Sequence, residues 1–136
     1  MSTQSATLQF PKWFPPDCPP TGASDASGIV FRFATKNPVA AEDFLSHHEL
    51  GLAPKAKPCS RAGLSVYRTI SSARRRLREL RDRSPARFGP HIAEGSLSAE
   101  HGKIKQEGGD PDHHEWWAYE GVERHAPFRI VETLES

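Results

Sequence analysis

Five prolines in the stretch FPKWFPPDCPP, residues 10–20, restrict the fold of this chain more than any other feature. Proline has no amide proton to donate and fixes its own φ angle, so neither a helix interior nor a central strand is expected there. The segment TGASDASG follows directly. We therefore expect residues 1–28 to form an arm and residues 29–136 a single domain. The aromatic residues Phe10, Trp13 and Phe14 should hold the arm against the domain, since exposed aromatics would be a liability in a free tail.

A strand is predicted directly after the arm. The segment GIVFRFA, residues 28–34, alternates in the two-residue period of a strand with one strongly apolar face. Ile29, Phe31 and Phe33 form that face. Arg32 should therefore point away from it.

The next segment, residues 37–51, carries a full set of helix signals. Asn37 is the expected N-cap, Pro38 occupies the first helical position, and Gly51 follows the end. Apolar residues recur at the helical spacing, which places His48 on the buried stripe. We predict one continuous helix here.

The remaining elements predict the fold class. LSVYRT, residues 64–69, is typical of a strand, and a helix should follow, capped by Ser71 or Ser72 and stopped by Pro85. HIAEGSL, HGKIKQ and PFRIVETL predict further strands. The order indicates an α+β domain with a mostly antiparallel sheet of about five or six strands, two helices and the proline-rich arm.

The net charge of +1 conceals two oppositely charged regions. Residues 60–91 hold nine arginines against two acidic residues, whereas residues 92–136 hold ten acidic residues against four basic ones. Either the two regions neutralise each other across the fold, or the basic helix faces an anionic partner. Our leading hypothesis is a small cytoplasmic interaction domain without a cofactor, which binds an acidic protein or nucleic acid. The candidate binding residues are Arg74, Arg75, Arg78 and Arg81.

The triplet His-His-Glu occurs twice, at residues 47–49 and 113–115. Histidine and glutamate are common ligands of zinc and related divalent metals. Neighbouring side chains diverge on a helix and alternate on a strand, so one histidine of each pair is expected to face a shared ion. The proposed set is His48, His113 and Glu115, which would give a metal-dependent hydrolase. The structural alternative is a core histidine at position 48, with the EWWAY segment as a cluster that packs in the core or against the arm.

Cellular location and thiol state are predicted from simple absences. No apolar run approaches the ~20 residues of a membrane helix, and the N-terminus lacks the pattern of a signal peptide. We therefore expect a cytoplasmic protein in which Cys18 and Cys59 are packed or reactive thiols, with a disulfide as the alternative in oxidising surroundings. Either Cys59 or Ser65 could pair with a histidine as nucleophile and base. No glycine-rich phosphate loop occurs, which argues against the ordinary nucleotide-binding folds.

Three segments, VFRF, GLSVYRTISSARRRL and HIAEGSL, resemble the core of small bacterial ADP-ribosyltransferase-like domains. The resemblance implies that Arg32 contacts a dinucleotide, with Ser65 as the strand hydroxyl and NAD as the substrate. It also implies a catalytic glutamate on a late strand, for which Glu132 in RIVETL is the candidate; Glu94 or Glu115 would need a different topology. The chain also resembles small bacterial proteins that share its Cys-Pro-Pro and His-His-x-Trp-Trp segments, which implies a bacterial origin.

Overall fold

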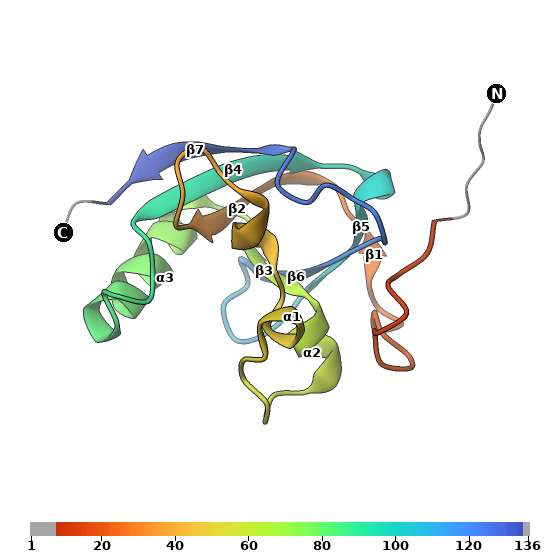
Figure 1. Ribbon diagram of the computed structural model, residues 1–136. Helices are drawn as coiled ribbons and strands as arrows, with labels where there is room; N and C mark the ends of the chain where they lie inside the picture. The colour runs from red at the N-terminus through yellow and green to blue at the C-terminus, as the bar shows by residue number, and fades with distance from the viewer. Residues whose placement is uncertain (1–7, 135–136) are drawn as a thin grey trace.

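Seven antiparallel strands form one sheet in the computed structural model, which describes residues 8–134 (Figure 1). The strands follow the order β1-β5-β6-β3-β2-β4-β7. They are β1 (Ser24–Asp25), β2 (Gly28–Ala34), β3 (Leu64–Tyr67), β4 (His91–Leu97), β5 (Gly102–Gln106), β6 (His113–Ala118) and β7 (Phe128–Thr133). The helices are η1 (Ala41–Phe44), α1 (His47–Leu50), α2 (Pro58–Ala62), α3 (Ile70–Arg83) and η2 (Ala99–His101). The predicted α+β class is confirmed, with seven strands in place of five or six.

The proline-rich arm contributes the edge strand β1. Ser24 lies opposite Ile104 of β5 in the antiparallel register. Nearer the N-terminus, the ring of Phe10 lies 4.6 Å from that of Tyr119. A short edge strand is compatible with proline-rich neighbours because only one of its sides needs hydrogen bonds. Residues 1–7 of the predicted arm and residues 135–136 lie outside the described residues.

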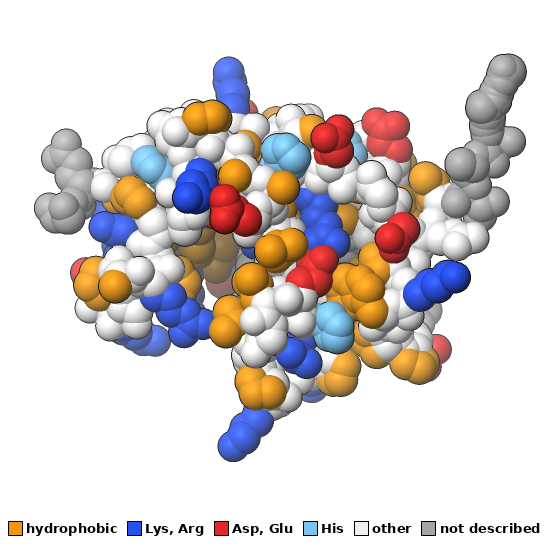
Figure 2. All heavy atoms as spheres, in the orientation of Figure 1, with side chains coloured by type: hydrophobic (Ala, Val, Ile, Leu, Met, Phe, Trp, Pro, Cys, Tyr) orange, Lys and Arg blue, Asp and Glu red, His pale blue; other side chains and the backbone are white. Residues whose placement is uncertain are grey.

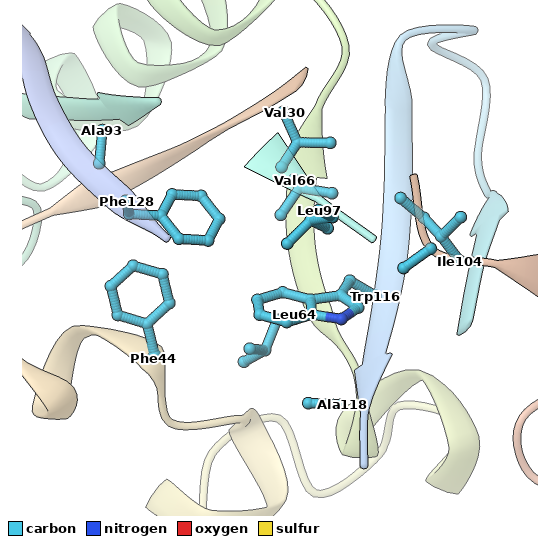
Figure 3. Close-up of a cluster of buried hydrophobic side chains, with 11 residues drawn as sticks. Val30, Phe44, Leu64, Val66, Ala93, Leu97, Ile104, Trp116, Ala118 and Phe128 are labelled. Carbon is cyan, nitrogen blue, oxygen red and sulfur yellow. The ribbon is translucent and has the colours of Figure 1, made fainter. Parts of the chain in front are cut away.

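The sheet curls around its main hydrophobic core (Figure 3). Ile104 of β5 and Phe128 of β7 belong to one buried cluster, although four strands lie between them in the sheet. Trp116 of β6 is fully buried in this cluster, and its ring lies 5.9 Å from that of Phe128. The prediction of a core or arm-packing cluster for the EWWAY segment is met at Trp116 by the core alternative, since its side chain faces the inside of the curl.

Helix α3 covers the opposite face of the sheet. Ala73 and Leu77 are fully buried against a second cluster that includes Phe31 and Ile92. This confirms the predicted helix. The N-cap is Thr69, whose hydroxyl accepts a hydrogen bond from the amide of Ser72 at 3.2 Å. Neither Ser71 nor Ser72 caps the helix as predicted, because α3 begins at Ile70.

The single helix predicted for residues 37–51 is wrong, because two short helices, η1 and α1, take its place. The carbonyl of Asp43 accepts a hydrogen bond from Arg32 Nε at 3.1 Å, and the carbonyl of Phe44 accepts one from Arg124 Nη1 at 2.7 Å. In a continuous helix these two carbonyls would accept hydrogen bonds from the amides four residues later. Here they accept hydrogen bonds from arginine side chains instead. Ser46 then starts α1 with a capping box.

The C-terminal end of this segment follows the prediction. Gly51 caps α1 with a φ of 70°, a conformation that glycine adopts without steric cost. His48, however, is exposed and its ring stacks on that of Trp13 at 4.5 Å. Its predicted place on a buried stripe is wrong, since the helix that would carry that stripe is interrupted.

Cys18 and Cys59 form a disulfide, with their Cα atoms 5.5 Å apart. The expectation of two free thiols is therefore wrong. The arm folds back over α2, so a separation of 41 residues in sequence becomes a short distance in space. Disulfides are more typical of oxidising compartments than of the cytoplasm, so the cytoplasmic location stays a prediction. Between residues 8 and 134, no helix is long and apolar enough to cross a membrane.

Candidate functional site

A cavity of about 290 Å³ lies where the sheet opens between β2 and β3. Strand β2 pairs with β4 at seven positions but with β3 at one, Phe31 opposite Tyr67. The two strands therefore separate beyond that pair. The segments around η1, α1 and α2 cover the gap (Figure 1). Among the lining residues, those with charged or hydrogen-bonding side chains include Arg32, His47, Ser60, Arg61, Ser65 and Glu115.

Arg32 bridges the gap between the separated strands. Its Nη1 donates a hydrogen bond to the carbonyl of Ser65 at 2.9 Å, and its guanidinium lies 5.4 Å from the centre of the Phe44 ring. As predicted, the side chain points away from the face formed by Ile29 and Phe31. Burial lowers the pKa of Arg32 to about 10, so the guanidinium keeps its positive charge at neutral pH.

Glu115 provides a buried carboxyl group at the same cavity. It lies opposite Ser65 in the register of β3 and β6, and its side chain shares the Ser65 face. Burial raises the pKa of Glu115 to about 7, while the nearby charge of Arg32 acts in the opposite direction. Its Oε2 atom has no hydrogen-bond partner among residues 8–134. Arg32 and Glu115 form no ion pair within 4.0 Å in this part of the chain.

Gly63 makes room for the Glu115 carboxyl. A Cβ atom at this position would lie 2.7 Å from Glu115 Oε2 and 3.0 Å from the indole nitrogen of Trp117. That indole nitrogen donates a hydrogen bond to the carbonyl of Cys59 at 2.9 Å. The backbone of α2 is thereby held close to β6, with glycine at the closest approach.

Ser65 links Glu115 to His113. The Ser65 hydroxyl lies 3.1 Å from His113 Nε2 and 3.5 Å from Glu115 Oε1. His113 Nδ1 lies 2.7 Å from the carbonyl of Glu107, which can only accept a hydrogen bond. We therefore assign the proton of the neutral imidazole to Nδ1, which makes Nε2 an acceptor for the Ser65 hydroxyl. The serine–histidine pair considered from the sequence is thus assembled with His113.

Positive charge gathers around His47, which lines the cavity. The pKa of His47 is lowered by burial and further by the positive charges of Arg32, Arg87 and Arg61. Arg61 Nε donates to the carbonyl of Leu52 at 3.0 Å. Neither Arg61 nor Arg87 forms an ion pair with a carboxylate in the described part of the chain. An anionic group would therefore be stabilised here.

The glutamate chosen from the sequence lies elsewhere. Glu132 is on β7 at the edge of the sheet and does not line the cavity. Both of its carboxylate oxygens accept hydrogen bonds from Arg74, each at 2.7 Å. The structure thus places Arg32 and Ser65 at one cavity and joins them with Glu115, whereas Glu132 is held in a bidentate ion pair.

The arginines of α3 divide into paired and exposed groups. Lys and Arg side chains gather over this helix at the lower left of Figure 2. Arg74 is paired with Glu132, and Arg81 Nη1 donates to the carbonyl of Phe88. Arg75 is exposed and lies 3.5 Å from a carboxylate oxygen of Asp110. Arg78 is exposed and has no ion pair within residues 8–134.

The residues of the proposed metal site do not gather. His113 Nε2 lies 3.9 Å from Glu115 Oε1, but His48 stacks on Trp13 of the arm. No group of three or more histidine, cysteine, aspartate or glutamate residues that could hold a metal ion is found from residue 8 to residue 134.

Comparison with known proteins finds no matching family model, no matching curated protein and no matching solved structure. The chemistry of the site therefore rests on its geometry. Sequence reasoning gave Glu115 to the metal site and preferred Glu132 as the catalytic glutamate, because Glu115 would have needed a different topology. The two-residue period of a strand at residues 113–118 did predict that His113 and Glu115 share one face. This period was the sequence signal that could have located the site.

Proposed function

We propose that this cavity is the active site of an enzyme that cleaves or transfers the glycosidic bond of an anionic nucleotide such as NAD. One observation carries the proposal: Arg32 and Glu115 face the same cavity without pairing with each other. Burial of an ionisable group is costly unless a partner compensates it. A ligand with a negative charge for Arg32 and a hydrogen-bond donor for Glu115 Oε2 would supply both partners.

The class of substrate is inferred from the positive charges of the arginines that line the cavity. Arginine binds phosphate through a planar, multidentate guanidinium, and Arg61 lies with Arg32 on the cavity wall. A ribose hydroxyl would supply the donor for Glu115. The resemblance to ADP-ribosyltransferase-like domains supports the same roles for Arg32 and Ser65. The catalytic glutamate then becomes Glu115, in place of Glu132.

The reaction uses the carboxylate of Glu115. When the bond between nicotinamide and ribose breaks, nicotinamide leaves with the bonding electron pair as a neutral molecule, and positive charge develops on the sugar. A carboxylate beside that carbon stabilises the charge, as in glycoside hydrolysis. Water or an acceptor hydroxyl then attacks the carbon, and its proton passes to Glu115. A pKa of about 7 is well suited to a general base near neutral pH.

Release of nicotinamide from NAD tests the proposal. The purified chain is incubated with NAD, and nicotinamide is quantified by liquid chromatography. Glu115→Gln should lower turnover by at least about 100-fold, because it removes the charge that meets the transition state. Arg32→Lys should chiefly raise KM, because the point charge stays while the planar fork is lost.

Two matched controls accompany these variants. Glu132→Gln removes a carboxylate at the sheet edge, and Arg78→Lys changes an exposed arginine. Both should release nicotinamide at the rate of the wild type. The proposal fails if the wild type produces no more nicotinamide than Arg32→Ala, or if Glu115→Gln remains fully active.

A second candidate function is binding of an acidic protein or nucleic acid by α3. It is favoured by the exposure of Arg75 and Arg78, which between them have one ion pair in the described residues, at 3.5 Å. Arg74 and Arg81 are less available, because carboxylate and carbonyl groups of the same chain engage them. Charge reversal at Arg75 and Arg78 should abolish a salt-sensitive interaction. Binding that is unchanged by this double reversal would reject the candidate.

A further inference from the structure

We infer that His113 and Ser65 form a proton relay to Glu115, in which His113 is a positioning residue that takes up the carboxyl proton and releases it to solvent after turnover. The inference rests on the proposed function, because the relay prepares Glu115 for the reaction at the cavity. It assigns a role to His113, which does not line the cavity itself.

The hydrogen bonds give the relay its direction. The carbonyl of Glu107, 2.7 Å from His113 Nδ1, fixes the ring and leaves the Nε2 lone pair facing Ser65 at 3.1 Å. When Glu115 is ionised, the Ser65 hydroxyl donates to Oε1 at 3.5 Å. When Glu115 is protonated, the Ser65 hydroxyl turns its proton to Nε2, and its oxygen presents a lone pair to Oε1. A proton on Oε1 is therefore accepted by Ser65, and Oε2 is left for the ligand.

The proton transfers balance, with solvent as the final acceptor of the proton that the reaction releases. The Oε1 proton moves to the Ser65 oxygen while the Ser65 proton moves to His113 Nε2. Glu115 thereby becomes a carboxylate and His113 an imidazolium, separated by 3.9 Å. The carboxylate meets the positive charge on the sugar and then accepts the proton of the attacking water or hydroxyl. Proton loss from His113 to solvent and return of Ser65 to its first hydrogen bond complete the cycle.

The surroundings of the relay contain few other ionisable groups. Tyr67 of β3 lies 5.3 Å from the His113 ring, and Glu107 follows β5. Arg32 of β2 and Glu107 both act on the charge of Glu115. His114 is the neighbour of His113 on β6, but its side chain lies on the other face of the strand. Glu107 is also paired with Lys105, whose Nζ lies 3.0 Å from Glu107 Oε2.

The variant His113→Asn separates a relay from a structural role. An asparagine amide can still donate to the Glu107 carbonyl, but nothing replaces Nε2. At neutral pH we expect the kcat for nicotinamide release to fall by about 5-fold, with little change in KM, because a shift of one pH unit lowers the ionised fraction of Glu115 at most about tenfold. The acid limb of the kcat profile should move up by about one pH unit, because the imidazolium no longer stabilises the carboxylate. Activity should therefore recover as the pH rises.

His114→Asn is the matched control, since it makes the same change one residue away on the opposite face of β6. Its pH profile should match that of the wild type. If His113→Asn lowers kcat equally at every pH, or leaves it unchanged while Glu115→Gln is inactive, the relay is rejected and the proposed function stands. If Glu115→Gln is fully active, the proposed function itself fails.

A measurement on the protein without substrate tests the relay independently of turnover. The nitrogen chemical shifts of the His113 ring distinguish its two neutral tautomers. We expect the proton on Nδ1 in the wild type and in Glu115→Gln. A proton on Nε2 would overturn the relay, because Ser65 could not then donate to the ring.

Discussion

Replacement of Glu115 with glutamine should change how the stability of the fold depends on pH. Glutamine has nearly the shape of the protonated carboxyl group but cannot ionise. Glu115 is 8% exposed, and burial raises its pKa from 4.5 to about 7. Between these two values the native state binds more protons than the unfolded state, so the free energy of unfolding of the wild type falls as the pH rises.

The magnitude follows from the shift in pKa. One pKa unit corresponds to about 1.4 kcal/mol, so ionisation of Glu115 should cost the fold about 3 kcal/mol above pH 7. Below pH 4.5 the carboxyl group is protonated in both states and the cost disappears. Glu115→Gln should therefore be as stable as the wild type at acid pH and more stable by about 3 kcal/mol at pH 8.

Urea unfolding of both proteins, followed by tryptophan fluorescence from pH 4 to pH 8, measures this difference. Subtraction of the two curves removes the contributions of other titrating groups. Glu132→Gln gives a control of opposite sign, because the hydrogen bonds from Arg74 lower the pKa of the Glu132 carboxyl. That variant should lose stability at neutral pH and approach the wild type as the pH falls. A wild-type-to-Glu115→Gln difference that stays constant with pH would refute the assignment of Glu115 as a buried, uncompensated acid.

Three further changes test other parts of the structure. Gly63→Ala places a Cβ atom 2.7 Å from Glu115 Oε2, and the displaced carboxyl should lower nicotinamide release by up to about 100-fold; steady-state kinetics alongside a thermal melt would detect this. Replacing Cys18 and Cys59 together by serine opens a loop with a separation of 41 residues, which should cost about 4 kcal/mol in urea unfolding; a loss under about 1 kcal/mol would contradict the bond. Leu77→Ala should cost about 2 to 5 kcal/mol in the same assay, because Leu77 is 0% exposed on the buried face of α3, and an unchanged midpoint would show that α3 does not pack as described.

Local sequence patterns correctly predicted the elements whose structure depends mainly on residues close together in the sequence. The alternation of residues 28–34 gives β2 with the observed bounds, and the punctuation at Pro85 places the end of α3 correctly. The segment 37–51 had equally clear signals but folded differently. Arg32 and Arg124, which are distant in sequence, bind the carbonyls that a continuous helix would have used. Tertiary contacts of this kind leave no mark on local periodicity.

The candidate site could be predicted only in part for a related reason. Arg32 and Ser65 were identified, and the strand period placed His113 beside Glu115. Sequence order, however, does not show that β6 is the neighbour of β3, since a residue's position along the chain does not determine its place in the sheet. The carboxyl partner was therefore sought on the last strand, where Glu132 instead pairs with Arg74.

The order of the strands also determines when the proposed active site can form during synthesis. A nascent chain emerges from the ribosome with β2 and β3 long before β6, and domains fold as their residues become available. Arg32 and Ser65 are therefore synthesised before Glu115, which follows Ser65 by 50 residues in the sequence. A truncated product that ends before β6 has the cation and the hydroxyl but lacks the acid. Catalytic competence would thus report that translation has passed β6.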